Sequence, residues 1–181
     1  MMDNKTLAKP FTLILALLVM TAISPTVYAA QSSFYGGINI GSGDVDFSGY
    51  EDSDTLSIYA GNNLSDQMAI EFGYTDLGEF EVTGFSSAHV EVDGLEVSVV
   101  GKMPTGNTLE LFGRLGLYMW DAEGVLFGVP VGSDSGTSVT FGVGLDMHFS
   151  QNFGGRIAFQ HYGDVADADI TNVTLGIFTS F

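Results

Sequence analysis

Few side chains in this sequence could carry out catalysis. The chain has three histidines and no cysteine. His148 precedes Ser150 by two positions, a pairing that could serve nucleophilic hydrolysis. His161 is followed by Tyr162, whereas His89 has no visible set of partners. We interpret Ser150 as a turn residue and the His161–Tyr162 pair as part of an aromatic girdle. The sequence therefore predicts no catalytic residue.

Carboxylates are the other candidate ligands. They are dense in two stretches, residues 44–54 and 164–169. Neither stretch has the spacing of an EF-hand calcium loop, and a chain without cysteine has no thiolate zinc site. We expect a solvated acidic surface that divalent cations screen loosely. The sequence therefore predicts no specific metal site and no cofactor.

The charge balance excludes a nucleic-acid partner. The 181-residue chain has 22 acidic and only 5 basic residues, for a formal net charge of −17. Binding to phosphate backbones requires the opposite, a basic footprint. Despite this charge, 45% of the residues are hydrophobic and the mean hydropathy is +0.27. A protein of this length forms one domain, and this one must tolerate extensive apolar surface.

The first 29 residues have the features of a cleaved secretory signal peptide. Lys5 and Lys9 form a positive start, residues 11–20 are continuously apolar apart from Thr12, and Pro25 follows. The apolar run is short of the ~20 residues that a spanning helix needs. We predict cleavage after Ala29, which leaves residues 30–181 as the mature domain. No later stretch is long and apolar enough for a transmembrane helix, so a membrane location would require a barrel of strands.

From residue 34 onward, apolar residues recur at every second position, the period of a β-strand. Eight segments show this pattern, at residues 34–40, 56–60, 68–74, 95–99, 109–119, 139–149, 153–159 and 173–181. The complementary face is small or polar. It carries the three basic residues of the mature chain, Lys102, Arg114 and Arg156. The pattern predicts eight strands, each with one apolar and one polar face.

The connections alternate in length. Tight turns are predicted at residues 64–66, 104–107 and 150–152, and longer acidic loops around residues 43–53, 76–93, 121–136 and 163–169. Short turns at one end and long loops at the other are typical of bacterial outer-membrane barrels. A soluble β-sandwich also alternates, but the glycine-rich, lysine-poor polar face and the length of the apolar faces favour a barrel. We predict an all-β, eight-stranded, antiparallel, up-and-down transmembrane barrel.

Eight strands enclose a lumen that side chains fill, so charges inside it must be paired. A turn centred on Gln151 places Asp146 opposite Arg156. A turn centred near residue 105 places Glu96 opposite Arg114 and Lys102 opposite Thr108. We expect cross-strand ion pairs at the first two positions, with two glutamates of neighbouring strands within reach. The predicted lumen network comprises Glu71, Glu96, Glu110, Arg114, Asp146 and Arg156.

Several short motifs resemble a known family. They are Phe34–Gly37, Ala69–Gly78, Leu111–Tyr118, Gly142–Gly144 and Tyr162–Val165, in this order along the chain. In these motifs residues 33–181 resemble the eight-stranded outer-membrane barrels related to the transmembrane domain of outer membrane protein A, including the opacity-like surface proteins. The resemblance implies a closed barrel with both termini in the periplasm of a Gram-negative bacterium. We expect no counterpart of the periplasmic peptidoglycan-binding domain of larger family members, so the resemblance does not imply a tethering role.

The resemblance also implies partners. These are outer-membrane lipid, lipopolysaccharide and the barrel-assembly machinery, which reads a terminal strand that ends in an aromatic residue. In this chain the assembly signal would comprise Val173, Leu175, Ile177 and Phe181, although Thr179 is less apolar than the family pattern. The sequence favours a structural or surface-interaction role without catalysis. The alternatives are a lipid-modifying barrel enzyme, a narrow ion pore and a soluble periplasmic β-sandwich binding module.

Overall fold

The computed structural model describes residues 34–46, 51–106 and 108–181. The predicted signal peptide, residues 1–29, lies outside these ranges. The described chain forms eight β-strands, which are β1 (Phe34–Val45), β2 (Ser53–Ser65), β3 (Met68–Val82), β4 (Phe85–Pro104), β5 (Leu109–Leu126), β6 (Val129–His148), β7 (Phe153–Val165) and β8 (Ala168–Ser180). No helix capable of crossing a membrane occurs in this part of the chain.

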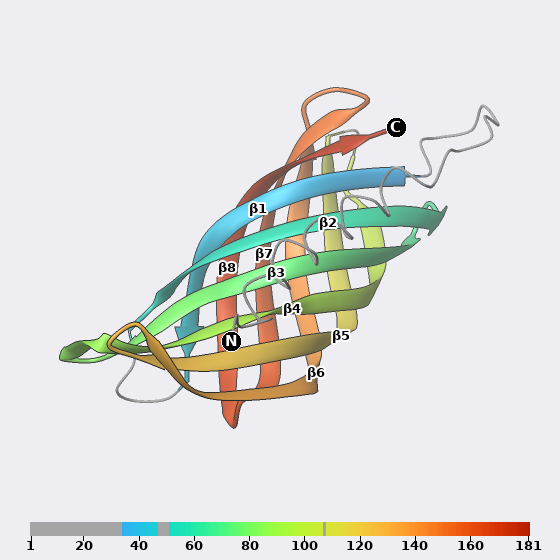
Figure 1. The fold of residues 1–181 in the computed structure, drawn as a ribbon. Coiled ribbons are helices and arrows are strands. Elements are labelled where there is room, and N and C mark those ends of the chain that lie inside the picture. Colours follow the sequence, from blue (N-terminus) through green and yellow to red (C-terminus); the bar gives the residue numbers. More distant parts are fainter. Residues whose placement is uncertain (1–33, 47–50, 107) are drawn as a thin grey trace. The chain divides into compact units, whose positions relative to one another are not determined.

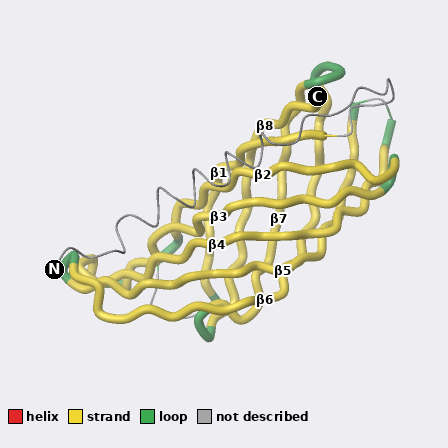
Figure 2. Tube along the Cα trace, turned by 45° about the vertical axis from the view of Figure 1, so that its right-hand side comes forward, coloured by secondary structure: helices red, strands yellow, loops and turns green. Residues whose placement is uncertain are grey.

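The strands close into a barrel (Figures 1 and 2). Each strand pairs antiparallel with the next along the chain, and β8 returns to pair with β1. Closure removes the two unpaired edges that an open sheet would leave. The predicted eight-stranded antiparallel barrel is confirmed.

Side chains alternate between the outside and the lumen, as the period of two requires. Outside, large apolar residues are exposed on every strand, for example Phe72 at 61%, Leu115 at 62% and Leu175 at 58%. Inside, the same strands bury polar and charged groups such as Glu71 and Arg156, each at 2%. An apolar exterior around a polar interior is stable in lipid and unstable in water.

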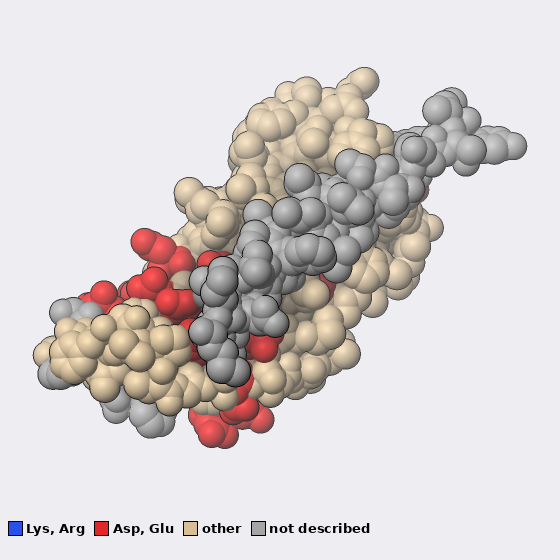
Figure 3. All heavy atoms as spheres, in the orientation of Figure 1, with Lys and Arg blue, Asp and Glu red and all other residues tan. Residues whose placement is uncertain are grey.

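This apolar belt ends abruptly on β3, β4 and β5. Its last row consists of Tyr74, Leu95 and Met119. The next row consists of three directly opposed aspartates, Asp76, Asp93 and Asp121, and beyond a bulge lies a row of glutamates, Glu79, Glu91 and Glu123. We call these two rows the acidic face. Figure 3 shows acidic side chains gathered towards one end of the barrel.

The predicted long loops at residues 76–93, 121–136 and 163–169 were wrong. These residues extend the hairpins β3–β4, β5–β6 and β7–β8, which close in short turns. All three turns use left-handed backbone, at Gly84, at Phe127–Gly128 and at Ala166–Asp167. The strands were missed because their outward residues beyond the belt are acidic on β3, β4 and β5 and serines on β6, so the apolar alternation that marks a membrane strand stops there. Of the fourth predicted loop, residues 47–50 lie outside the described ranges.

The two ends of the barrel therefore differ. One end holds the start of β1, the end of β8 and the three turns after β2, β4 and β6; we call it the terminus end. The other end carries the extended hairpins and the acidic face; we call it the extended end. The functional candidates lie in the lumen between the two ends and on the outside of the extended end.

Candidate functional site

Arg156 lies at the centre of the lumen. Its Nε and Nη2 donate to the two carboxylate oxygens of Asp146, at 2.7 and 2.8 Å, and its Nη1 donates to Glu71 at 2.9 Å. The guanidinium carbon lies 4.5 Å from the ring centre of Tyr59 and 4.4 Å from that of Phe112. A bidentate carboxylate and two aromatic faces are the partners that best replace water around an arginine.

Glycines make room for the rings around this cation. A Cβ added at Gly144 would lie 2.3 Å from the Phe112 ring, and one added at Gly37 would lie 2.6 Å from the Tyr59 hydroxyl. These distances are too short for any side chain. The glycine-rich inward face of the sequence therefore corresponds to the space that the aromatic side chains occupy.

Arg114 joins the network from β5, which is separated by β6 from the strand that carries Arg156. Its Nη2 donates to Glu71 at 2.6 Å, and its Nη1 donates to the Gln160 side chain at 3.0 Å. Glu96 lies 3.8 Å from the same Nη1. The Gln160 amide also donates to Glu96, at 2.8 Å. Two guanidiniums and three carboxylates thus form one connected set across the lumen.

Glu71 connects the two arginines. One oxygen accepts from Arg156 and from the Tyr35 hydroxyl, which lies 2.7 Å away, and the other accepts from Arg114. Because this carboxylate is fully enclosed, each of its hydrogen bonds replaces lost water. Tyr35 was not predicted as part of the network. The sequence could have placed it there, because Tyr35 follows the outward-facing Phe34 and side chains alternate along a strand.

Of the two predicted strand registers, the β6–β7 register agrees with the structure and the β4–β5 register does not. Asp146 is opposite Arg156, as predicted. Glu96, however, is opposite Tyr118, and Arg114 is opposite Val100. The β4–β5 turn lies further along the chain than predicted, because β4 continues to Pro104.

Lys102 and Glu110 form a separate pair nearer the terminus end. Lys102 is opposite Phe112, not Thr108 as predicted, and its Nζ lies 3.4 Å from Glu110. The same Nζ is 4.4 Å from the Tyr35 ring. Glu110 was predicted to reach the arginine network, but the structure pairs it with this lysine.

Towards the extended end the lumen becomes apolar. Tyr118 and Tyr162 pack edge to face with ring centres 4.8 Å apart. The surrounding cluster consists of Leu77, Phe80, Val92, Trp120, Ala122, Val165 and Ile170. A pocket of about 220 Å³ opens beside it, lined mainly by valine and alanine side chains of β1, β4 and the β7–β8 hairpin. The lumen thus contains an ion-paired layer and an apolar layer in series.

The two candidate catalytic pairs are not brought together. Ser150 Oγ accepts hydrogen bonds from the backbone N–H groups of Asn152 and Phe153, at 3.4 and 3.1 Å, as expected of a turn residue. His148 packs edge-on against Phe178 instead.

His161 lies on the outer surface, where it contacts Phe141 and Thr171. Tyr162 is buried in the lumen, so it is not part of the aromatic girdle that the sequence predicted here.

His89 does have partners. It lies on the β3–β4 hairpin, not in a loop, with Nε2 3.8 Å from a Glu79 oxygen and 3.5 Å from a Glu91 oxygen. The sequence could not show this cluster, because the β3–β4 register contains two bulges between the belt and the turn.

An eight-stranded antiparallel barrel with an apolar belt and an ion-paired lumen is the architecture of a small outer-membrane protein. A family model described as the OmpA-like transmembrane domain matches residues 26–180. The chain therefore belongs to the family of OmpA-like transmembrane domains, and it resides in the outer membrane of a Gram-negative bacterium. No curated protein matches the sequence.

Solved structures of small surface proteins share this fold. Neisserial surface protein A is 15% identical, with a TM-score of 0.69 over 83% of this chain and 98% of that chain. Ail, the attachment invasion locus protein of Yersinia pestis, is 16% identical, with a TM-score of 0.63 over 84% of this chain and all of that one. The N-terminal barrel of OprF from Pseudomonas aeruginosa is 17% identical, with a TM-score of 0.58 over 83% and 98%. At these identities the likeness shows the fold alone.

Proposed function

We propose that this protein is a non-catalytic surface protein, a sealed barrel that displays acidic hairpins outside the cell. The observation that carries the proposal is the filling of the lumen. Arg156 and Glu71, at its centre, are enclosed on all sides, and an apolar cluster blocks the path between them and the extended end. A barrel of this kind separates two compartments and presents its outer surface for contact.

Orientation and assembly follow the family pattern in this proposal. The terminus end lies in the periplasm, and the extended end lies outside the cell beyond the lipopolysaccharide leaflet. The signal peptide, residues 1–29, directs export. The terminal strand β8 and Phe181, which follows it, supply the sequence that the assembly machinery reads. Val173, Leu175, Ile177 and Phe181 are all exposed.

The acidic face sets the class of extracellular partner. Its carboxylates project outward in rows, and the three cationic side chains of the described residues, Lys102, Arg114 and Arg156, all point into the lumen. Ail has been crystallised with the heparin analogue sucrose octasulfate, a polyanion. A polyanion would be repelled by the surface described here. We propose cationic partners for this chain, and divalent cations as the bridge to anionic lipopolysaccharide.

Conductance and lipid analysis test this proposal. The purified protein in planar bilayers should give no steady current at either sign of voltage, with a known porin as the positive control. Regular single-channel steps would overturn the sealed lumen. Overexpression should leave the mass of lipid A and the phospholipid composition unchanged, whereas a new acylation state would indicate an enzyme.

Binding to charged polymers tests the surface role. Cells that display the protein should bind a fluorescent polylysine more strongly than cells that lack it, and should not gain binding of heparin. The matched variant Asp93→Asn/Asp121→Asn keeps the barrel and removes two charges of the acidic face, so it should bind less polylysine. Heparin binding above background would contradict the proposed partner class.

A further inference from the structure

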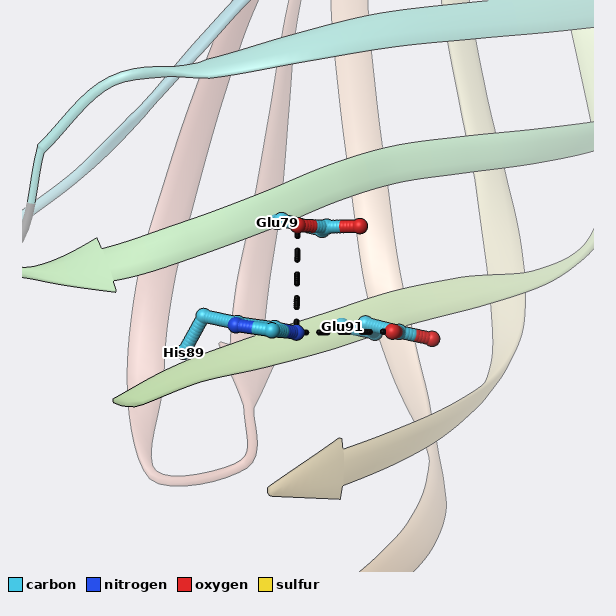
Figure 4. Close-up of side chains that lie close together, drawn as sticks. All are labelled: Glu79, His89 and Glu91. Carbon is cyan, nitrogen blue, oxygen red and sulfur yellow. Dashed lines mark ion pairs between the residues drawn. The ribbon is translucent and has the colours of Figure 1, made fainter. Parts of the chain in front are cut away.

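Three side chains with metal-binding atoms converge on the outer surface of the β3–β4 hairpin. Glu79 on β3 is directly opposite Glu91 on β4, and His89 lies two residues before Glu91 on the same face. The His89 ring nitrogen and one carboxylate oxygen of each glutamate all lie within 4.8 Å of one another. Figure 4 shows the imidazole of His89 directed at both carboxylates.

The spacing of these atoms fits one small cation. Zinc binds histidine nitrogen and carboxylate oxygen at about 2.0–2.2 Å, so neighbouring ligand atoms of a tetrahedral site lie roughly 3.4 Å apart. In the structure, His89 Nε2 is 3.5 Å from Glu91 Oε1 and 3.8 Å from Glu79 Oε2. Both distances from the imidazole are within about 0.4 Å of this value, and the two carboxylate oxygens lie within 4.8 Å of each other, so the three side chains can share one ion.

The surroundings favour a cation for a separate reason. Glu91 is directly opposite Glu123 as well as Glu79, and the neighbouring row places Asp93 between two further aspartates. Like charges directly opposite each other destabilise a sheet. None of the three cationic side chains in the described residues reaches this surface, because all of them point into the lumen. A bound divalent ion would offset this repulsion.

The ligand set discriminates between metals. Calcium takes six to eight oxygen ligands and magnesium retains much of its water, so neither gains from an imidazole. Imidazole combined with carboxylate suits zinc and its first-row neighbours. We propose that Glu79, His89 and Glu91 bind one Zn²⁺, with the fourth position open to water or to a group from a partner. The ion joins β3 to β4 outside the membrane.

Titration calorimetry tests this site on tag-free, refolded protein in detergent after treatment with a chelator. One equivalent of Zn²⁺ per barrel should bind, and a tenfold excess of Ca²⁺ or Mg²⁺ should not displace it. The variant His89→Gln replaces the imidazole ligand with an uncharged amide. Since loss even of groups that only orient a ligand weakens metal binding about 10–100-fold, His89→Gln should weaken zinc binding at least tenfold.

Two variants serve as controls, and Glu79→Gln is a second test. His161→Gln removes another surface imidazole, and Asp121→Asn removes one charge from the acidic face. Neither residue is a proposed ligand, so the zinc dissociation constant of each variant should stay within about twofold of the wild-type value, well below the change expected when a ligand is lost. Glu79→Gln should weaken binding as His89→Gln does. A heat-shift gel confirms that each variant is folded. Wild-type zinc affinity in folded His89→Gln, equal weakening by Asp121→Asn, or displacement by calcium would each overturn the proposal.

Discussion

Substitution of Arg156 by methionine tests the lumen network most sharply. The change removes the bidentate pair with Asp146, one contact to Glu71 and the guanidinium that packs against the Tyr59 and Phe112 rings. Glu71 keeps Arg114 and Tyr35 as partners, so the loss falls mainly on Asp146, whose carboxylate remains buried without its guanidinium.

Breaking a buried ion pair by removing one partner costs about 3–5 kcal/mol. We expect Arg156→Met to lower the free energy of unfolding by this amount, a large part of the roughly 5–15 kcal/mol typical of a folded domain. Removing both charges should cost much less, because an apolar pair of similar volume is often neutral. The double variant Asp146→Leu/Arg156→Met should therefore recover at least about 2 kcal/mol of the loss.

Urea titration in detergent micelles or lipid vesicles measures these changes. Trp120 is the only tryptophan and is buried in the apolar layer, where its indole donates to Ser138 at 2.8 Å, so its fluorescence reports unfolding of the barrel. Lys102→Met is the matched control. Its Nζ lies 3.4 Å from one carboxylate and 4.4 Å from the Tyr35 ring, and its side chain is 10% exposed whereas that of Arg156 is fully enclosed, so we expect a smaller loss than in Arg156→Met. A loss below about 1 kcal/mol in Arg156→Met, or a double variant no more stable than the single one, would refute the reasoning.

Three further changes test the belt, the closure and the assembly signal. Leu115→Arg, near the middle of the belt, should cost about 2–4 kcal/mol in lipid vesicles, whereas Asp121→Arg on the acidic face should cost little; equal effects would contradict the assignment of the lipid-facing surface. Gly176→Ala would place a methyl group 2.3 Å from the Ile38 carbonyl oxygen, where β1 pairs with β8, so the folded fraction on unboiled gels should fall. Gly132→Ala is the control, because nothing lies within 4 Å of the added methyl group. Equal folded fractions in the two variants would argue against tight packing between β1 and β8. Deletion of Phe181 should lower the amount of protein inserted in the outer membrane in cells, and unchanged insertion would remove the proposed signal.

The faces of the strands could be predicted because the period of two is a property of the extended backbone. The register of β6 and β7 was also accessible, since their turn is short enough for its centre to be located. The register of β4 and β5 was displaced by four residues. An even displacement keeps every residue on its own face, so Arg114 and Glu96 still meet inside the barrel. Their side chains lie 3.8 Å apart, offset by four residues along the paired strands β4 and β5.

The sequence placed Glu71 within reach of the network, but the particular contacts across the lumen could not be predicted from it. Glu71 and Arg156 are 85 residues apart and lie on strands that do not pair. Their distance depends on the tilt and stagger of the closed barrel, which single hairpins do not determine. The extended hairpins were hidden for another reason. Beyond the belt, apolar side chains such as Leu77 and Phe80 face inward and carboxylates face outward, so the pattern is that of a water-soluble sheet.

Sedimentation of the refolded mature protein, with and without detergent, tests the central claim most directly. That claim is that the exposed leucine, isoleucine, valine and phenylalanine side chains of the belt contact lipid. The account predicts a folded, monodisperse species only when detergent or lipid is present, and aggregation when it is removed. A folded, monodisperse species in plain buffer would contradict the account.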